Sequence, residues 1–145
     1  MSEPNAIPKI EAWITEQLKT DATLAALVQR RVFNEYAPPK TDTPYIVFAI
    51  QPGSHYVQGV GDTRLMTRAE YLIKLVTSGA PTNQELEGLD QFDVLIGKQS
   101  NAQLNGFLFS GRGLHPVKYV EPRPGTAHFY THSGSVFQID AYPAP

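Results

Sequence analysis

The chain has 145 residues, the length of one ordinary domain, and we expect residues 1–145 to fold as a single unit. Hydrophobic residues make up 41% and charged residues 18%, so the composition excludes a chain that is disordered throughout. The net charge of −2 excludes a global basic field that would hold nucleic acid, and the lack of cysteine excludes disulfides and thiolate chemistry.

The N-terminal part predicts two helices. Residues 1–8 are polar and lack the apolar run of a secretion signal, and Pro8 suits the first turn of a helix. The apolar residues that follow, at helical spacing, form one stripe: Ile10, Trp13, Ile14 and Leu18. Thr20 or Asp21 can cap a second short helix, which carries Leu24, Leu27 and Val28.

Strands are expected next. Residues 31–35 predict a short strand, and residues 45–50, apolar at every position, predict a strand covered on both faces. This run is far shorter than the roughly 20 residues that cross a bilayer, so no membrane segment is expected. Residues 67–76 alternate in polarity and predict a second strong strand. The glycine-rich stretch from Gly53 to Asp62 predicts a long hairpin loop between the two.

A third helix is predicted by the residues from Thr82 to Glu85, which have the form of a capping box. This helix is expected to end near Gly97. Beyond it, residues 107–109 and 136–142 predict strands, with a turn at Ser133 and Gly134 before the last one.

The segment 111–124 is interrupted by glycine and proline, and residues 117–121 within it are a candidate edge strand. Taken in chain order, the elements predict the α+β class. We expect an antiparallel sheet of about four to five strands, with helices packed on one face and a long projecting hairpin.

The histidines are the first candidates for chemistry: His55, His115, His128 and His132. His128 and His132 have the spacing of a metal-binding pair on a helix, but their segment is not convincingly helical and a third ligand is missing. We therefore expect both to face solvent, with no metal and no cofactor. The alternative is a small enzyme or ligand-binding domain that uses these two histidines with nearby carboxylates.

Other catalytic patterns are absent from the sequence. The glycines from Gly53 to Gly61 lack the lysine of a phosphate-binding loop, and no G-x-S-x-G elbow occurs. The acidic residues near the start of the third helix suit the helix dipole: Glu85, Glu87, Asp90 and Asp93. No catalytic residue is predicted.

As a whole, the chain resembles the tail-completion, or tail-terminator, proteins of long-tailed bacteriophages and related prophage elements. The resemblance rests on residues 18–28, 31–33 and 37–39 and on the run Thr43-Pro44-Tyr45-Ile46-Val47-Phe48. It continues in the strand 71–76, the helix from Thr82 and the closing strand 137–142. The departure is the segment 111–133, which is longer and richer in proline than the family pattern.

The resemblance implies a structural virion protein that is no enzyme. Members of this family form a ring, typically a hexamer, at the head-proximal end of the tail tube. The ring stops tube polymerisation and gives the head connector, or head-completion protein, a docking surface. Genome DNA passes through the ring without sequence-specific binding. The implied location is the neck of the virion, after synthesis in the bacterial cytoplasm. The alternative is another neck component, such as a head-completion or adaptor protein, or a tail-tube-like subunit.

One segment of this sequence is a candidate for the subunit interface of such a ring. A closed ring needs one patch on each subunit to meet a different patch on the next. The expected hairpin carries apolar and aromatic residues that suit such a contact: His55, Tyr56, Val57, Leu65 and Met66. We expect residues 51–66 to form an arm that contacts an adjacent subunit or the tube, the alternative being a surface loop.

Overall fold

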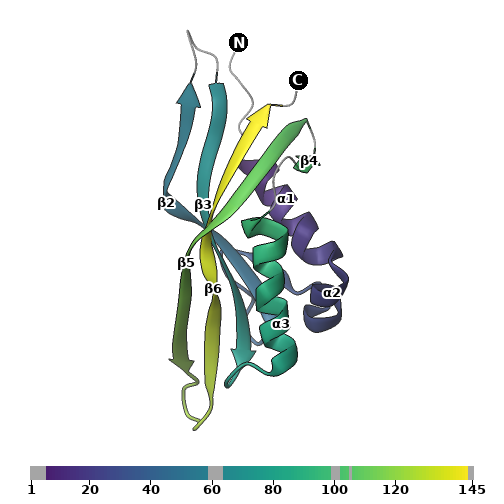
Figure 1. Cartoon of the computed structure of the whole chain (residues 1–145). Coiled ribbons are helices and arrows are strands. Elements are labelled where there is room, and N and C mark those ends of the chain that lie inside the picture. Colours follow the sequence, from purple (N-terminus) through teal and green to yellow (C-terminus); the bar gives the residue numbers. More distant parts are fainter. Residues whose placement is uncertain (1–5, 59–63, 99–101, 105, 144–145) are drawn as a thin grey trace.

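A computed structural model of the chain describes residues 6–58, 64–98, 102–104 and 106–143. Its helices are α1 (Ile7–Thr20), α2 (Ala22–Val28) and α3 (Asn83–Phe92), the last continued by a π-helical turn, η1 (Asp93–Gly97). Its strands are β1 (Val32–Asn34), β2 (Tyr45–Gln58), β3 (Arg64–Ser78), β4 (Ala102–Leu104), β5 (Phe107–Pro122) and β6 (Phe129–Pro143). The helices lie on one side of a strongly twisted sheet, which confirms the α+β class (Figure 1).

The strands form one mixed sheet in the order β1-β2-β3-β6-β5-β4. The structure departs from the expected antiparallel sheet of about four to five strands in one pair, because β1 pairs with β2 in parallel. The loop 35–44 carries the chain back to the end at which β1 began. Backbone hydrogen bonds fix both ends of this loop, from Ile46 N to Arg31 O (2.9 Å) and from Glu35 N to Phe48 O (2.7 Å).

The two predicted N-terminal helices are confirmed. Asp21 separates them and caps α2, with its Oδ2 accepting a hydrogen bond from Leu24 N at 3.1 Å. Its Oδ1 accepts another from the Gln91 side chain of α3 at 2.9 Å. One short acidic side chain therefore begins a helix and ties it to its neighbour.

The capping box of α3 is confirmed as well. Thr82 N donates to Glu85 Oε1 (2.8 Å), and Glu85 N donates to Thr82 Oγ1 (3.2 Å). At the other end, η1 packs directly on β5 because Gly111 has no side chain, and an added Cβ would meet the Ile96 carbonyl. The glycine that interrupts the sequence pattern of β5 thus makes room for a helix.

The C-terminal hairpin differs most from the expectation. β5 runs unbroken through Gly113 and Pro116, with an irregularity between Gly113 and His115, and pairs with β6 along its length. Ser133 and Gly134, expected to form a turn, lie in the middle of β6. A Cβ at Gly134 would meet the Ile73 carbonyl of β3, so this glycine serves close strand contact rather than a turn.

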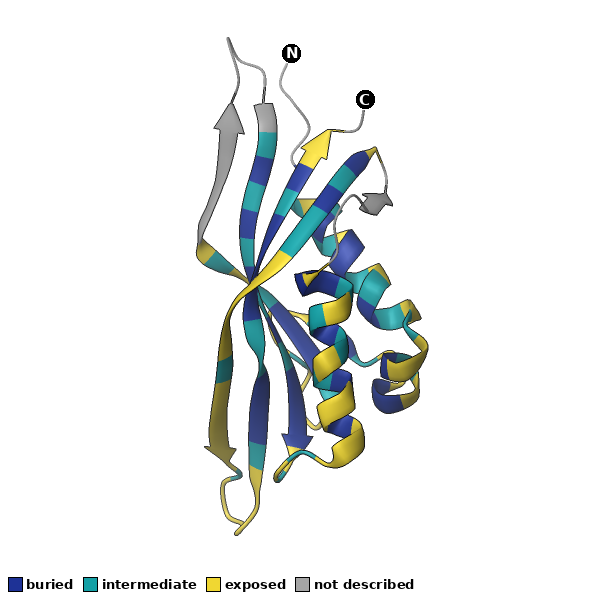
Figure 2. Cartoon of the chain, viewed as in Figure 1, coloured by how far each residue is buried: buried dark blue, intermediate teal, exposed yellow. Residues whose placement is uncertain are grey.

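The core lies between the helices and the facing side of the sheet, where the dark blue positions of Figure 2 gather. Trp13 of α1 stacks on Phe109 of β5, with ring centroids 5.1 Å apart. The hydroxyl of the buried Tyr71 donates to Glu11 Oε2 at 2.9 Å. The apolar stripe of α1 is fully buried: Ile10, Trp13, Ile14 and Leu18. The far half of β5, by contrast, is exposed on both sides (Figure 2).

β2 and β3 pair antiparallel from Tyr45, opposite Val76, to Gln58, opposite Arg64. The strands therefore extend into the stretch that the sequence assigns to a loop. Residues 59–63, which join them, lie outside the described residues. The long projecting hairpin stays a prediction.

Candidate assembly surfaces

The predicted interface residues lie on paired backbone. In the register of β2 and β3, His55 is opposite Arg68 and Val57 is opposite Met66. Met66 is half-buried. The side chains of the other four predicted residues (His55, Tyr56, Val57 and Leu65) lie outside the described part of the structure. Their role as an interface stays a prediction.

The two histidines singled out for chemistry have different surroundings. His128 is exposed in the turn before β6, whereas His132 is buried within β6. The expectation that both face solvent was wrong for His132, whose side chain is only 8% exposed. Among the described residues, no three acidic or histidine side chains are grouped so that they could hold a metal ion.

His132 belongs to a polar cluster on the side of the sheet opposite the helices. Its Nε2 lies 2.7 Å from Glu121 Oε1, and its ring stacks on Tyr119 with centroids 4.3 Å apart. Lys74 of β3 donates to the Tyr119 hydroxyl at 2.7 Å. His132 is thus enclosed by side chains from the neighbouring strands on both sides.

The environment of His132 lowers its pKa below the ordinary value. Burial is the main cause, and the nearby Lys74 adds to it, while the bond to Glu121 acts in the opposite direction. If Nε2 carries the proton in that bond, Nδ1 is a bare acceptor, and it is buried with no partner among the described residues. Protonation would place an unsatisfied N–H there, which reinforces the preference for the neutral ring.

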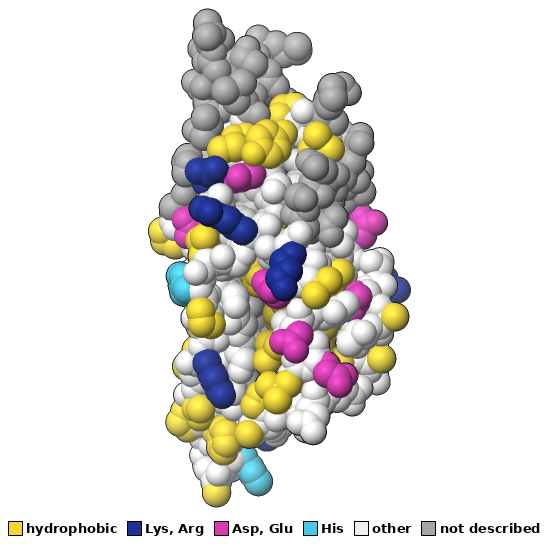
Figure 3. All heavy atoms as spheres, in the orientation of Figure 1, with side chains coloured by type: hydrophobic (Ala, Val, Ile, Leu, Met, Phe, Trp, Pro, Cys, Tyr) yellow, Lys and Arg dark blue, Asp and Glu magenta, His cyan; other side chains and the backbone are white. Residues whose placement is uncertain are grey.

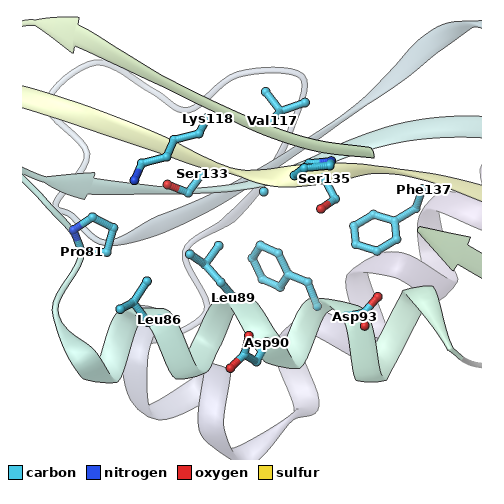
Figure 4. A pocket seen from close by; sticks show the side chains of 13 residues that line it. Pro81, Leu86, Leu89, Asp90, Asp93, Val117, Lys118, Ser133, Ser135 and Phe137 are labelled. Carbon is cyan, nitrogen blue, oxygen red and sulfur yellow. The ribbon is translucent and has the colours of Figure 1, made fainter. Parts of the chain in front are cut away.

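A groove lies on the other side of the sheet, between α3 and the exposed half of β5 (Figure 4). Its volume is about 400 Å³. Apolar side chains contribute most of the lining: Pro81, Leu86, Leu89, Phe92, Pro116, Val117 and Phe137. Ser133 forms part of the floor, and its Oγ is buried with no partner among the described residues.

Charges of both signs border this groove. Asp90 comes from α3, Asp93 from the start of η1 and Lys118 from β5. Asp93 is engaged already, because its Oδ2 lies 3.3 Å from Lys98 Nζ. Figure 3 shows acidic side chains over α3 and hydrophobic ones gathered toward the β5–β6 turn. The groove therefore has an apolar lining and acidic residues along one of its edges.

Other large apolar side chains are exposed outside the groove. Val120 (57%) and Phe129 (39%) are exposed near the end of the β5–β6 hairpin. Tyr36, in the loop after β1, is 77% exposed. The sequence pattern did not predict the groove or these exposed residues. The high proline content of residues 111–133 was the one signal, and it pointed to the segment that contributes the β5 side of the groove.

The arrangement is suited to binding a protein segment. Exposed aromatic and aliphatic side chains around a concave apolar surface are typical of protein contacts. None of the described helices is both long and apolar enough to cross a membrane.

Comparison with known proteins shows the fold. No protein-family model matches the chain, and no curated protein matches it in sequence. A chain in the solved structure named "Virion of native gene transfer agent (GTA) particle" is similar over 96% of this chain and 99% of its own length, with a TM-score of 0.64 and 16% identity. A second solved chain has a TM-score of 0.56 and 14% identity, and covers 94% of this chain and 92% of its own.

Proposed function

We propose that this protein is a structural component of a phage-like virion, and that it acts as a tail terminator. It forms a ring on the head-proximal end of the tail tube, stops tube polymerisation and presents a docking surface to the head connector. Genome DNA passes through the lumen. The protein works through assembly and breaks no bonds.

One observation carries the proposal: the chain shares its fold, over nearly its whole length, with a chain of a gene transfer agent virion. The match covers 96% of this chain and 99% of the other chain, so it involves the whole fold rather than a common substructure. The tail-terminator role rests in addition on the sequence resemblance, above all on residues 43–48, which lead into β2 and form its first strand positions.

The surfaces of the monomer support an assembly role. The β5 edge is exposed, an apolar groove lies beside it, and large apolar side chains such as Tyr36 and Val120 face solvent. Such patches on a small protein mark contact sites. A subunit of a ring needs two of them, because each copy meets one neighbour on either side.

The test uses particles from the source of the gene. We expect gold-labelled antibody to bind at the junction of head and tail, and deletion of the gene to give tail tubes of uncontrolled length by electron microscopy. Adding the purified protein to growing tubes should restore a defined length. Label on another layer of the neck, or along the tube, would favour the adaptor or tube-subunit alternative. Unlabelled particles with normal tails would reject the virion role.

A further inference from the structure

We infer that the groove between α3 and β5 receives residues 36–40 of a second copy of this chain. The inference deepens the proposed function, on which it rests, because it assigns the contact that joins neighbouring subunits. Residues 36–40 read Tyr-Ala-Pro-Pro-Lys and belong to the loop between β1 and β2.

The segment has the chemistry of a protruding ligand. Tyr36 is 77% exposed, more than any other large hydrophobic side chain that the structure describes. Pro38 and Pro39 fix two φ angles of the segment, so less conformational freedom is lost on binding. Since Tyr36 is so exposed, it does not occupy the groove of its own copy.

The groove has the complementary chemistry. Its apolar walls, with Leu86 and Leu89 on one side and Pro116 on the other, suit an aromatic ring. The buried Ser133 Oγ lacks a partner among the described residues and could bond the hydroxyl of a tyrosine. A tyrosine brings both features in one side chain.

The charges agree with this placement. Lys40 is exposed and follows Tyr36 by four residues, in a turn at positions 39 and 40 where its own backbone is left-handed (φ 63°). Asp90 stands on the α3 rim of the groove, and the other acidic residue of that rim, Asp93, is already bridged to Lys98. Lys40 of one copy would meet the Asp90 rim of the next.

The sheet places the two patches at the same level on opposite edges. β1 ends the sheet on one side, while the exposed half of β5 ends it on the other. One row of partners crosses the sheet from Phe48 through Ile73 and Ser135 to Pro116. Glu35, the residue before Tyr36, donates its N–H to Phe48 O at this level, and Ser135 and Pro116 line the groove.

This placement favours a closed ring. Contacts between different patches build a ring when the operation between neighbours is a pure rotation, and a helical filament when a translation is added. Two patches at the same level along the strands can meet by rotation about an axis parallel to the strands, without a rise.

Engineered cysteines test the contact, because the natural chain has none. We would mix Tyr36→Cys protein with Leu86→Cys protein under mild oxidation and measure disulfide-linked dimers on a denaturing gel. The matched control replaces Leu86→Cys with Val94→Cys, which is similarly exposed but does not line the groove. We expect dimers between positions 36 and 86 and at least tenfold fewer with the control.

A second measurement follows association itself. Sedimentation velocity should show that Tyr36→Ala weakens self-association about tenfold or more, while Val94→Ala leaves it unchanged. Rings that form normally with Tyr36→Ala, or cross-linking no stronger than the control, would overturn the groove contact and leave the virion role standing. If the natural chain stays monomeric in solution and also when tail tubes are added, this result would overturn the contact too. The location of the antibody label tests the virion role separately.

Discussion

At the scale of single residues, His132 shows how a neighbouring strand decides the state of a titratable group. The sequence around it is not convincingly helical and offers no third metal ligand, which predicts a solvent-facing side chain. In the folded chain, Tyr119 covers one face of the ring, and Glu121 holds Nε2. Both residues come from β5, whose pairing with β6 could not be predicted from the segment that contains His132.

This environment predicts an acid-sensitive contribution to stability. The folded-state pKa of His132 is lowered, chiefly by burial, whereas the unfolded chain keeps a value of about 6.5. Below that pH the unfolded state binds a proton that the folded state resists, so the free energy of unfolding falls as the pH falls from about 6.5 through the folded-state pKa. Urea unfolding at pH 7.5, 6.5 and 5.5 should show a smaller decline for His132→Phe than for the natural chain.

The control for this experiment is His128→Phe. His128 is exposed four residues earlier, so its replacement should leave the pH dependence as it is in the natural chain. Phenylalanine at position 132 keeps a flat ring for Tyr119 but removes both the titration and the hydrogen bond to Glu121, so the comparison uses the change with pH and not the stability at one pH. Parallel pH profiles for His132→Phe and the natural chain would contradict the role assigned to His132.

At the scale of elements, local signals were sufficient for the helices. The α3 capping box needs only Thr82 and Glu85, three residues apart, and the Asp21 cap of α2 is equally local. These hydrogen bonds form within one turn, so the sequence that predicts them also contains both partners.

The strands β5 and β6 could not be predicted in the same way. In the sequence pattern, Gly111 and Gly134 indicate turns or breaks, but in the structure each lies where another backbone comes close. Pro116 also interrupts the strand pattern of the sequence. It is tolerated because only residues 107–109 of β5 pair with β4, so at Pro116 β5 is an edge strand that pairs with β6 alone. The contacts that decide the course of these strands are between residues far apart in the chain. The groove between these strands and α3 is likewise lined by residues far apart in the chain, so the sequence pattern did not predict it.

The close pairing of β3 and β6 gives a prediction for Gly134. A methyl group at this position would collide with the Ile73 carbonyl, and the Lys74 Cα would be 2.6 Å away. Both obstacles are backbone atoms of a central strand, which cannot rotate aside. We expect Gly134→Ala to lower the free energy of unfolding by about 3 kcal/mol, measured by urea denaturation.

Gly113→Ala is the matched control for this substitution. Gly113 lies in β5, and the nearest atom to an added Cβ is Asp93 Oδ1 at 3.5 Å, an ordinary contact. The expected loss is below about 1 kcal/mol. Equal losses for the two variants would mean that a general cost of replacing strand glycines, rather than the close approach of the β3 backbone, accounts for the effect.

At the scale of the whole molecule, the chain combines a well-packed centre with exposed contact surfaces at its edges. The core between helices and sheet contains the largest buried side chains, whereas the groove and the exposed half of β5 lie toward one edge. The predicted arm, residues 51–66, includes the parts of β2 and β3 that extend beyond the pairing of β1 with residues 46–48. Removing the arm should therefore spare the core.

We expect deletion of residues 54–62 to abolish ring formation while the monomer stays folded. The deletion removes the predicted interface residues His55, Tyr56 and Val57, but leaves the pairs from Tyr45–Val76 to Gln51–Glu70 in place. Sedimentation velocity and electron microscopy would measure rings, and thermal unfolding would verify the fold. A companion variant with serine at positions 55, 56 and 57 keeps the chain length, and the loss of its apolar side chains should weaken assembly in the same direction. If both variants assemble rings as the natural chain does, residues 54–62 are not a subunit contact, and the groove beside α3 would have to join the ring without them.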